Sequence, residues 1–307
     1  MPNEMTSPPK QIGFEKVVEH YSKKEVREEI FSFSKNRWVA IHCQRRDKKN
    51  RNLMFRYKKN GHPLTIGDPD DIEAIMKSLK IFFPRTFYSS VLRFNRVLLE
   101  EDVKDLSNAT AAMPTWDIDL EKDDWKLAVF AAKLILKALE SENVSKSVIL
   151  KWSGEGMHVH INDNAFSSEI YKKIHPLDLA YSITEYIIRK IRKDLPIGVR
   201  VDNEIDPQRV FTAPLSLHRN LDRVAVVIER NSLDSFNLSW VSIDSYIHFS
   251  GWKDFEKGEA DDLAKKAFLE IGGYPSSRKV APRRDLGEDI SDKIKEIEKK
   301  LKDDGYL

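Results

Sequence analysis

The segment W-D-I-D-L-E, Trp116 to Glu121, places two aspartates one residue apart in an otherwise apolar run. Acidic residues are depleted in strands and costly to bury, so their presence here needs a reason. If the segment is a strand, Asp117 and Asp119 project from one face and Ile118 from the other. Two like charges this close repel by a few kcal/mol at an effective dielectric of about 20. The pair therefore requires a positive partner.

The composition limits the class of protein. The chain has 307 residues, 41% of them hydrophobic, which is enough for one large domain or two intimate lobes. The net charge is only +2, so a polyanion must be met by local basic patches. The single cysteine, Cys43, excludes an internal disulfide and a zinc site built from several cysteines. Because no apolar run approaches the roughly 18 residues of a membrane span, and the N-terminus lacks a signal-peptide core, we expect a cytoplasmic protein without membrane contact.

Strand and helix patterns mix along the chain without strict alternation, which favours an α+β fold over a doubly wound parallel sheet. We expect a flexible N-terminal arm at residues 1–13, a core of two intimate lobes at 14–275, and a basic segment with an amphipathic helix at 276–307. Strands are expected at 37–43, 52–58, 85–94, 115–120, 147–152, 157–161 and 224–229, and helices at 14–34, 69–82, 124–139 and 176–193.

A second polar cluster lies in W-S-G-E-G-M-H-V-H-I, residues 152–161. Gly154 allows backbone N–H groups to approach a ligand closely, and Ser153 adds a hydroxyl at the end of a strand. His158 and His160 share one face of the following strand. A tight hairpin with one packed and one exposed histidine would explain the segment, and we favour packing for His160, whereas the glycine turn favours an anion contact for His158. A zinc site from both histidines lacks a spaced third ligand.

A third cluster lies in I-D-P-Q-R-V-F-T-A-P-L-S-L-H-R, residues 205–219. Asp206 is a candidate third carboxylate, and Arg209 follows three residues later. Ser216 and His218 would share a face if the segment is extended. A surface ion pair between Asp206 and Arg209, of little energetic value, is the simpler interpretation of this cluster alone. Together with the first two clusters, three carboxylates can hold two divalent ions for an in-line displacement at a triphosphate.

The order D-I-D, then S-G-x-G-x-H, then D-x-x-R followed by P-x-S-L-H resembles the archaeo-eukaryotic primase superfamily, most closely the small catalytic subunit of archaeal DNA primase. The resemblance extends over approximately Val26 to Ile228. It implies a two-lobed primase-polymerase core at 14–275, with an N-terminal α/β module, a C-terminal module related to the RNA-recognition fold, and the site between them. No zinc knuckle is expected, because only the helix at 124–139 and a short turn fill the interval where archaeal subunits usually carry one.

The resemblance also implies roles for residues of the three clusters. It implies a template-dependent nucleotidyltransferase that synthesises or extends a strand by two-metal phosphoryl transfer with Mg²⁺ or Mn²⁺. The expected partners are a single-stranded DNA template with its primer, nucleoside triphosphates and, optionally, a primase large subunit. The expected catalytic and metal-binding carboxylates are Asp117, Asp119 and Asp206, and the expected nucleotide-binding residues are Ser153, Gly154, His158, Arg209, Ser216, His218 and Arg219.

Three positions depart from the family pattern. The second motif is one residue shorter and lacks an arginine, which places Glu155 where it would repel phosphate. Thr212 replaces an arginine before the proline of the third motif. Asn220 replaces a lysine after the S-L-H histidine, so Arg219 or Arg223 would supply the charge. We expect these changes to affect nucleotide affinity more than metal binding.

Other functions fit parts of the pattern. An end-joining repair polymerase of the same superfamily would use the same residues. A D-x-D glycosyltransferase would bind a metal and a sugar nucleotide with the acid pair and give Asp206 no role. A nucleic-acid-binding subunit with a degenerate site would explain Glu155, Thr212 and Asn220. For a template, the basic segments Arg45 to Arg51 and Ser277 to Arg284 are candidate phosphate contacts, although solvated loops would have the same composition.

Overall fold

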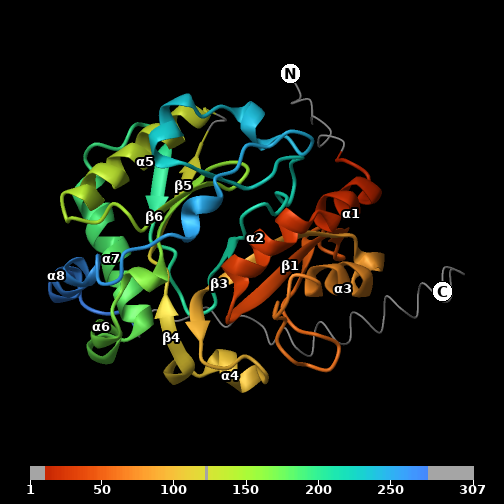
Figure 1. Cartoon of the computed structure of the whole chain (residues 1–307), viewed down its shortest axis with the longest axis horizontal. Helices are drawn as coiled ribbons and strands as arrows, with labels where there is room; N and C mark the ends of the chain where they lie inside the picture. The colour runs from red at the N-terminus through yellow and green to blue at the C-terminus, as the bar shows by residue number, and fades with distance from the viewer. Residues whose placement is uncertain (1–10, 122–123, 276–307) are drawn as a thin grey trace, which may run out of the picture.

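Two antiparallel β-sheets form the centre of the computed structural model, which describes residues 11–121 and 124–275 (Figure 1). The first sheet contains β1 (Arg37–Arg46), β2 (Asn52–Phe55), β3 (Pro84–Phe94), β4 (Ala109–Ala112) and β9 (Val210–Thr212). The second contains β5 (Thr115–Leu120), β6 (Val148–Trp152), β7 (Met157–Ile161), β8 (Val199–Asp202) and β10 (Val226–Ile228). The strand orders are β2-β1-β3-β4, with β9 pairing β3, and β10-β6-β7-β5-β8.

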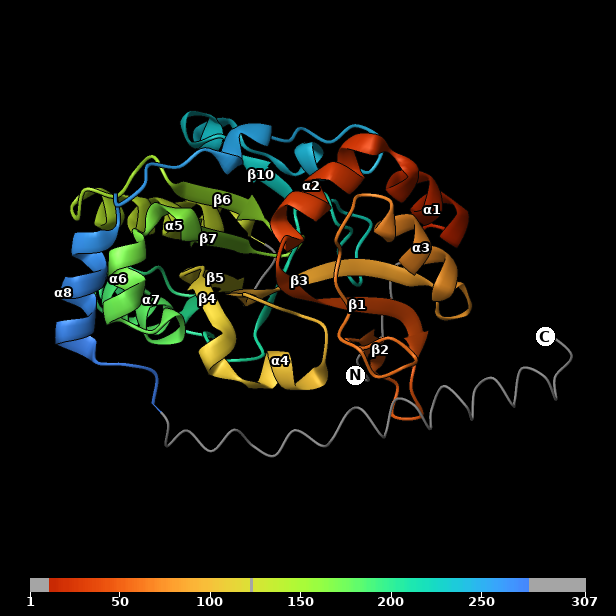
Figure 2. The same cartoon turned by 60° about the horizontal axis from the view of Figure 1, so that its bottom comes forward.

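Each sheet carries its own group of helices, so the chain forms two lobes (Figures 1 and 2). The helices beside the first sheet are α1 (Phe14–Ser22), α2 (Lys24–Ser34) and α3 (Asp71–Ser78), and the short α4 (Glu100–Lys104) precedes β4. Those beside the second are α5 (Trp125–Glu140), α6 (Ser168–Lys173), α7 (Pro176–Ile191) and α8 (Asp261–Ile271). Among the described residues, no helix combines the length and the apolar character that a membrane crossing requires.

The α+β architecture predicted from the sequence is confirmed, and two local features differ from it. Strand β9 comes from the C-terminal half of the chain but pairs with β3, so the first sheet is completed by a strand that follows the second lobe in the sequence. The helix expected at 14–34 is broken at Lys23, whose ψ of 129° is extended. The break allows α1 to turn toward the third sequence cluster, where His20 Nε2 contacts the Leu215 carbonyl oxygen at 2.8 Å.

The two predicted end segments fall largely outside the described residues. The predicted arm, residues 1–13, is described only from Gln11 onward. Gln11 Nε2 donates to the carbonyl oxygens of Arg219 and Asn220 at 3.2 and 2.9 Å, so this part of the chain contacts the third sequence cluster. The predicted basic segment and amphipathic helix at 276–307 lie outside the described residues.

A fully buried lysine links the two sheets. Lys151 of β6 donates from its ammonium group to the carbonyl oxygen of Thr212 in β9 at 2.5 Å, and the same nitrogen lies 4.5 Å from the ring centroid of Phe33. Burial lowers the pKa of Lys151 to about 7, against the opposing effect of Asp117. The hydrogen bond joins the second sheet to the first near the polar clusters of the sequence. A titratable group therefore contributes to the contact between the lobes.

Substitution of Lys151 by Met is expected to alter how stability depends on pH. Below about pH 7 Lys151 is protonated in both the folded and the unfolded chain, and above about 10.5 it is neutral in both. Between these values the unfolded chain binds more protons. The free energy of unfolding of the wild type should therefore rise relative to that of Lys151→Met by up to about 1.4 kcal/mol per pH unit. Denaturant titrations of both proteins measure this difference, and a constant difference across the range would contradict the lowered pKa.

Candidate functional site

The acid pair of the first sequence cluster belongs to a row of polar residues across the second sheet. Asp117 of β5 is paired with His158 of β7 on one side and with Asp202 of β8 on the other. Directly paired residues of antiparallel strands project from the same face. Asp119 lies two residues further along β5 and is paired with Arg200 of β8, so both share that face. The sheet therefore presents three carboxylates and one arginine on a single face.

Asp117 lies between an imidazole and a guanidinium. Its Oδ1 accepts from His158 Nε2 at 3.2 Å, and its Oδ2 accepts from Arg209 Nη2 at 2.9 Å. Burial acts to raise the pKa of Asp117, but His158, Arg209 and Lys151 outweigh this effect and hold that pKa below its usual range. Burial lowers the pKa of His158, so at neutral pH it is an uncharged ring that donates from Nε2. Asp117 is therefore an anion with both oxygens engaged.

Asp119 and Asp202 share one guanidinium. Arg200 donates from Nη2 to Asp119 Oδ2 and from Nε to Asp202 Oδ2, both at 2.8 Å. Arg209 likewise contacts two carboxylates, because it pairs with Glu204 as well as with Asp117. The positive partners that the acid pair requires are thus two arginines, one from β8 and one from the segment that leads into β9.

Asp206 lies apart from this face. Its Oδ1 accepts from the backbone N–H of Gln208 at 2.6 Å, so the carboxylate stabilises a turn, and Asp206 does not line the pocket between the sheets. The third carboxylate on the face of Asp117 and Asp119 is therefore Asp202, which is paired with Asp117 across the strands but, like Asp206, does not line the pocket. The alternation in V-R-V-D, residues 199–202, is a signal that could have identified Asp202, because a strand there places Arg200 and Asp202 on one face.

The S-G-E-G turn between β6 and β7 packs directly on its neighbours. Gly154 has a φ of +125°, and a Cβ at this position would lie 2.5 Å from Cγ of His218. A Cβ on Gly156 would lie 2.1 Å from the carbonyl oxygen of Ile118. The Ser153 hydroxyl donates to the Gly156 carbonyl oxygen at 3.1 Å and is therefore engaged within the turn. The two glycines therefore allow the turn to pack closely against β5, which carries Asp117 and Asp119, and against the segment that carries His218.

His218 faces Glu155 across the pocket. Its Nδ1 accepts from the backbone N–H of Leu221 at 3.1 Å, which leaves the proton on Nε2, 3.5 Å from Glu155 Oε2. Burial, and after it the neighbouring arginines, lower the pKa of His218 to about 3, so the ring is uncharged. Buried Arg85 fixes this loop, because its Nε donates to the His218 carbonyl oxygen at 2.8 Å and its Nη2 to Asp222 Oδ1 at 2.7 Å.

Two other residues of the sequence clusters lie in the core. The Ser216 hydroxyl oxygen accepts from the Phe87 backbone N–H at 2.8 Å and contacts the Tyr21 hydroxyl at 3.2 Å. Ser216 is fully buried beneath the site, away from the nucleotide contact expected for it. His160 is also fully buried, with Nδ1 2.8 Å from the Thr115 hydroxyl, which confirms the packing expected for this histidine.

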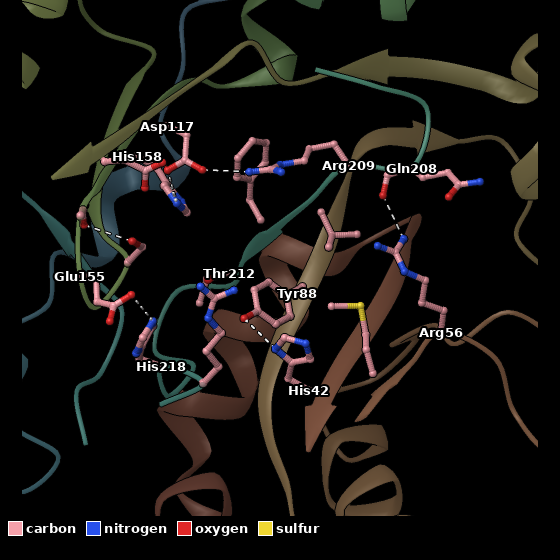
Figure 3. A pocket seen from close by; sticks show the side chains of 17 residues that line it. His42, Arg56, Tyr88, Asp117, Glu155, His158, Gln208, Arg209, Thr212 and His218 are labelled. Carbon is pink, nitrogen blue, oxygen red and sulfur yellow. Dashed lines mark hydrogen bonds and ion pairs between the residues drawn. The ribbon is translucent and has the colours of Figure 1, made fainter. Parts of the chain in front are cut away.

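A cavity of about 240 Å³ lies between the two sheets at the acid face (Figure 3). The predicted site residues that line it are Asp117, Asp119, Ser153, His158, Arg209, His218 and Arg219. Residues of the first sheet and the β9 segment that sequence reasoning missed also line it, namely His42, Met54, Arg56, Tyr88, Gln208 and Phe211. Tyr88 belongs to an aromatic run that is typical of a core strand, so its pattern gave no sign that its hydroxyl lies 3.4 Å from His42 Nδ1 at the cavity wall.

Comparison with known proteins finds similarity in structure but none in sequence families or curated proteins. The sequence matches no family model and no curated protein. The structure is similar to the polymerase domain from Mycobacterium tuberculosis Ligase D in complex with DNA, with a TM-score of 0.53 over 85% of this chain and 90% of that chain, at 13% identity. At this identity the likeness shows the fold, and the likeness to archaeal primase subunits stays a prediction. The chain therefore has a fold of the primase-polymerase type.

Proposed function

We propose that the chain is a template-dependent nucleotidyltransferase that synthesises or extends a nucleic-acid strand from nucleoside triphosphates. The observation that carries this proposal is that Asp117 and Asp119, two of the three carboxylates on one sheet face, line the same pocket as His218 and Arg219. Phosphoryl transfer needs this combination, because carboxylates bind divalent ions while N–H donors bind phosphate oxygens. The likeness in fold to a polymerase domain supports the same class of function.

The donor set fits Mg²⁺ or Mn²⁺. Hard divalent ions take carboxylate oxygens and keep positions for phosphate oxygens, and Asp117, Asp119 and Asp202 offer such oxygens from two adjacent strands. In residues 11–121 and 124–275, no three acidic, histidine or cysteine side chains converge tightly enough to hold an ion as they stand, and the three carboxylates are bonded to arginines. When bound, such ions supply activation of a 3′-hydroxyl and neutralisation of triphosphate charge.

The residues around the acids have separable roles in this proposal. His158 orients Asp117 through its Nε2–H. His218 presents an N–H, and Arg219 a fixed positive charge, at the wall of the pocket where phosphate oxygens would bind. Arg223 instead donates to the Gly154 carbonyl oxygen at 2.8 Å, so it holds the glycine turn in place. Arg219 and Arg223 were the two candidates to supply the charge of the lysine that Asn220 replaces, and of these Arg219 lines the pocket.

A nucleic-acid template completes the proposal, and the described basic residues suggest which of them would contact its phosphates. In the basic loop Arg45–Arg51, Arg51 makes two hydrogen bonds to Asp47, at 2.9 and 2.8 Å, so the loop offers less positive charge than its sequence suggests. Arg56 lines the pocket on the same lobe, with its guanidinium 4.9 Å from the ring centroid of Trp38. The second basic segment, 277–284, lies outside the described residues.

Strand synthesis by the purified chain tests the proposal. We expect incorporation of nucleotides on a primed single-stranded template in the presence of Mg²⁺ or Mn²⁺. Products on an unprimed template would indicate a primase, whereas strict dependence on a primer would indicate a repair-type polymerase, and addition of a primase large subunit tests the optional partner. Ribonucleotides and deoxyribonucleotides are supplied separately to define the preferred sugar. Failure of folded protein to incorporate either nucleotide under all of these conditions would contradict the proposal.

The position of the third carboxylate gives a sharper prediction. Asp202→Asn should reduce primer extension by more than about 100-fold, as Asp117→Asn and Asp119→Asn should, because each removes an oxygen ligand from the acid face. Asp206→Asn should stay within about threefold of the wild type, because the Asp206 side chain does not line the pocket and an asparagine oxygen can still accept the hydrogen bond from the Gln208 N–H. Steady-state extension rates measure both effects, and circular dichroism checks the fold. An active Asp202→Asn beside an inactive Asp206→Asn would return the third position to Asp206.

Glu155 should weaken nucleotide binding. Its carboxylate is exposed and lies 3.5 Å from His218 Nε2, where it competes with phosphate for the N–H group. Glu155→Gln should tighten binding of a fluorescent nucleoside triphosphate by about 2- to 10-fold at low salt, and less at high salt. Glu169→Gln, an exposed acid paired with Lys172 on α6, is the matched control and should leave the affinity unchanged. Weaker binding by Glu155→Gln would show that the carboxylate assists the nucleotide.

The contact between Glu155 and His218 also favours a second candidate function, a nucleic-acid-binding subunit with a degenerate site. In that case Glu155 would exclude triphosphate from the pocket while basic surface still binds a template. Calorimetric titration distinguishes the two functions, because template binding without nucleotide binding selects the second.

A further inference from the structure

Two arginines neutralise the acid face, but they are held in different ways. The Arg209 side chain is 28% exposed, and its guanidinium carbon lies 5.0 Å from the ring centroid of Phe211, so packing fixes it. The Arg200 side chain is 66% exposed and donates to Asp119 and Asp202 from the edge strand β8. Ion pairs this exposed contribute little to stability because water screens them, so Arg200 can leave its partners at small cost.

We propose that Arg200 is a positioning residue that stands in for a divalent cation, holding Asp119 and Asp202 together and leaving when an ion binds their oxygens. The inference rests on the proposed function, since it concerns the same carboxylates. It goes beyond that function because it assigns Arg200 control over how tightly the site binds metal.

The geometry supports this competition. Arg200 Nε and Nη2 belong to one planar group, and each lies 2.8 Å from an Oδ2 atom of a different aspartate. One guanidinium therefore contacts an oxygen of each aspartate, and these are the oxygens that a divalent ion would use. A guanidinium and an ion cannot occupy the same side of the same oxygens, so binding of one requires departure of the other. Because the ion carries two charges where the guanidinium carries one, the exchange favours the ion when it is abundant.

A purely structural role for Arg200 predicts different behaviour. Asp119 and Arg200 are directly paired across β5 and β8, and such cross-strand pairs of opposite charge stabilise a sheet modestly. In that case removal of Arg200 would lower stability by the same amount whether or not metal is present. In the proposed role the loss is confined to the metal-free protein, because a bound ion takes over the neutralisation of both aspartates.

Titration of Mn²⁺ into Arg200→Gln, followed by the electron paramagnetic resonance signal of unbound Mn²⁺, measures the competition. We expect binding to be about 3- to 10-fold tighter than in the wild type, because the competing guanidinium and its positive charge are removed. Arg189→Gln removes the same charge from α7, where Arg189 pairs with Glu185 outside the pocket, and should stay within about twofold of the wild type. Arg200→Lys, whose single ammonium cannot bridge both carboxylates, should fall between.

Thermal unfolding gives a second readout. Arg200→Gln should unfold at a lower temperature than the wild type without added metal, and saturating Mn²⁺ should remove that difference. Equal or weaker Mn²⁺ binding by folded Arg200→Gln, or an unfolding difference that Mn²⁺ does not change, would overturn the inference. If Mn²⁺ binds through the three aspartates but no nucleotide is incorporated, the proposed function fails while the role of Arg200 stands.

Discussion

Repulsion among Asp117, Asp119 and Asp202 is the constraint that the surrounding structure satisfies. Like charges this close on one sheet face repel each other, and cations placed between them offset that repulsion. The neighbouring strand supplies Arg200, and the segment that crosses to the first sheet supplies Arg209. The pocket therefore lies at the place in the fold where chain segments from both lobes meet, because one lobe alone does not neutralise the acids.

The return of the chain to the first sheet as β9 is connected with the neutralisation of the acids. The chain leaves β8, passes Arg209 and joins β3 as β9, so the arginine that holds Asp117 is anchored in the opposite sheet. Lys151 reaches back from the second sheet to the carbonyl oxygen of Thr212 in that strand. These two contacts between the lobes are polar, so hydrogen bonds with strict directions add to the apolar packing there.

The sequence predicted the fold class and part of the site for physical reasons that can be traced. A period of two puts Asp117 and Asp119 on one face without any knowledge of neighbouring strands. The choice between Asp202 and Asp206 depends on strand register, which local pattern does not contain, so the sequence did not indicate that Asp202 shares a face with Asp117. The bond from Arg200 to two aspartates was missed for the same reason. Residue type could not show that Ser216 would be used inside the core.

Gly154 has a consequence for how this protein can change. Any side chain at that position would meet the ring of His218, which lies on a segment 64 residues away in the sequence. Position 154 is therefore closed to other residues on two grounds, because the positive φ would strain any side chain even if His218 were made smaller. New substrate preferences are more accessible through the other residues of the turn, or through the cavity wall of the first sheet.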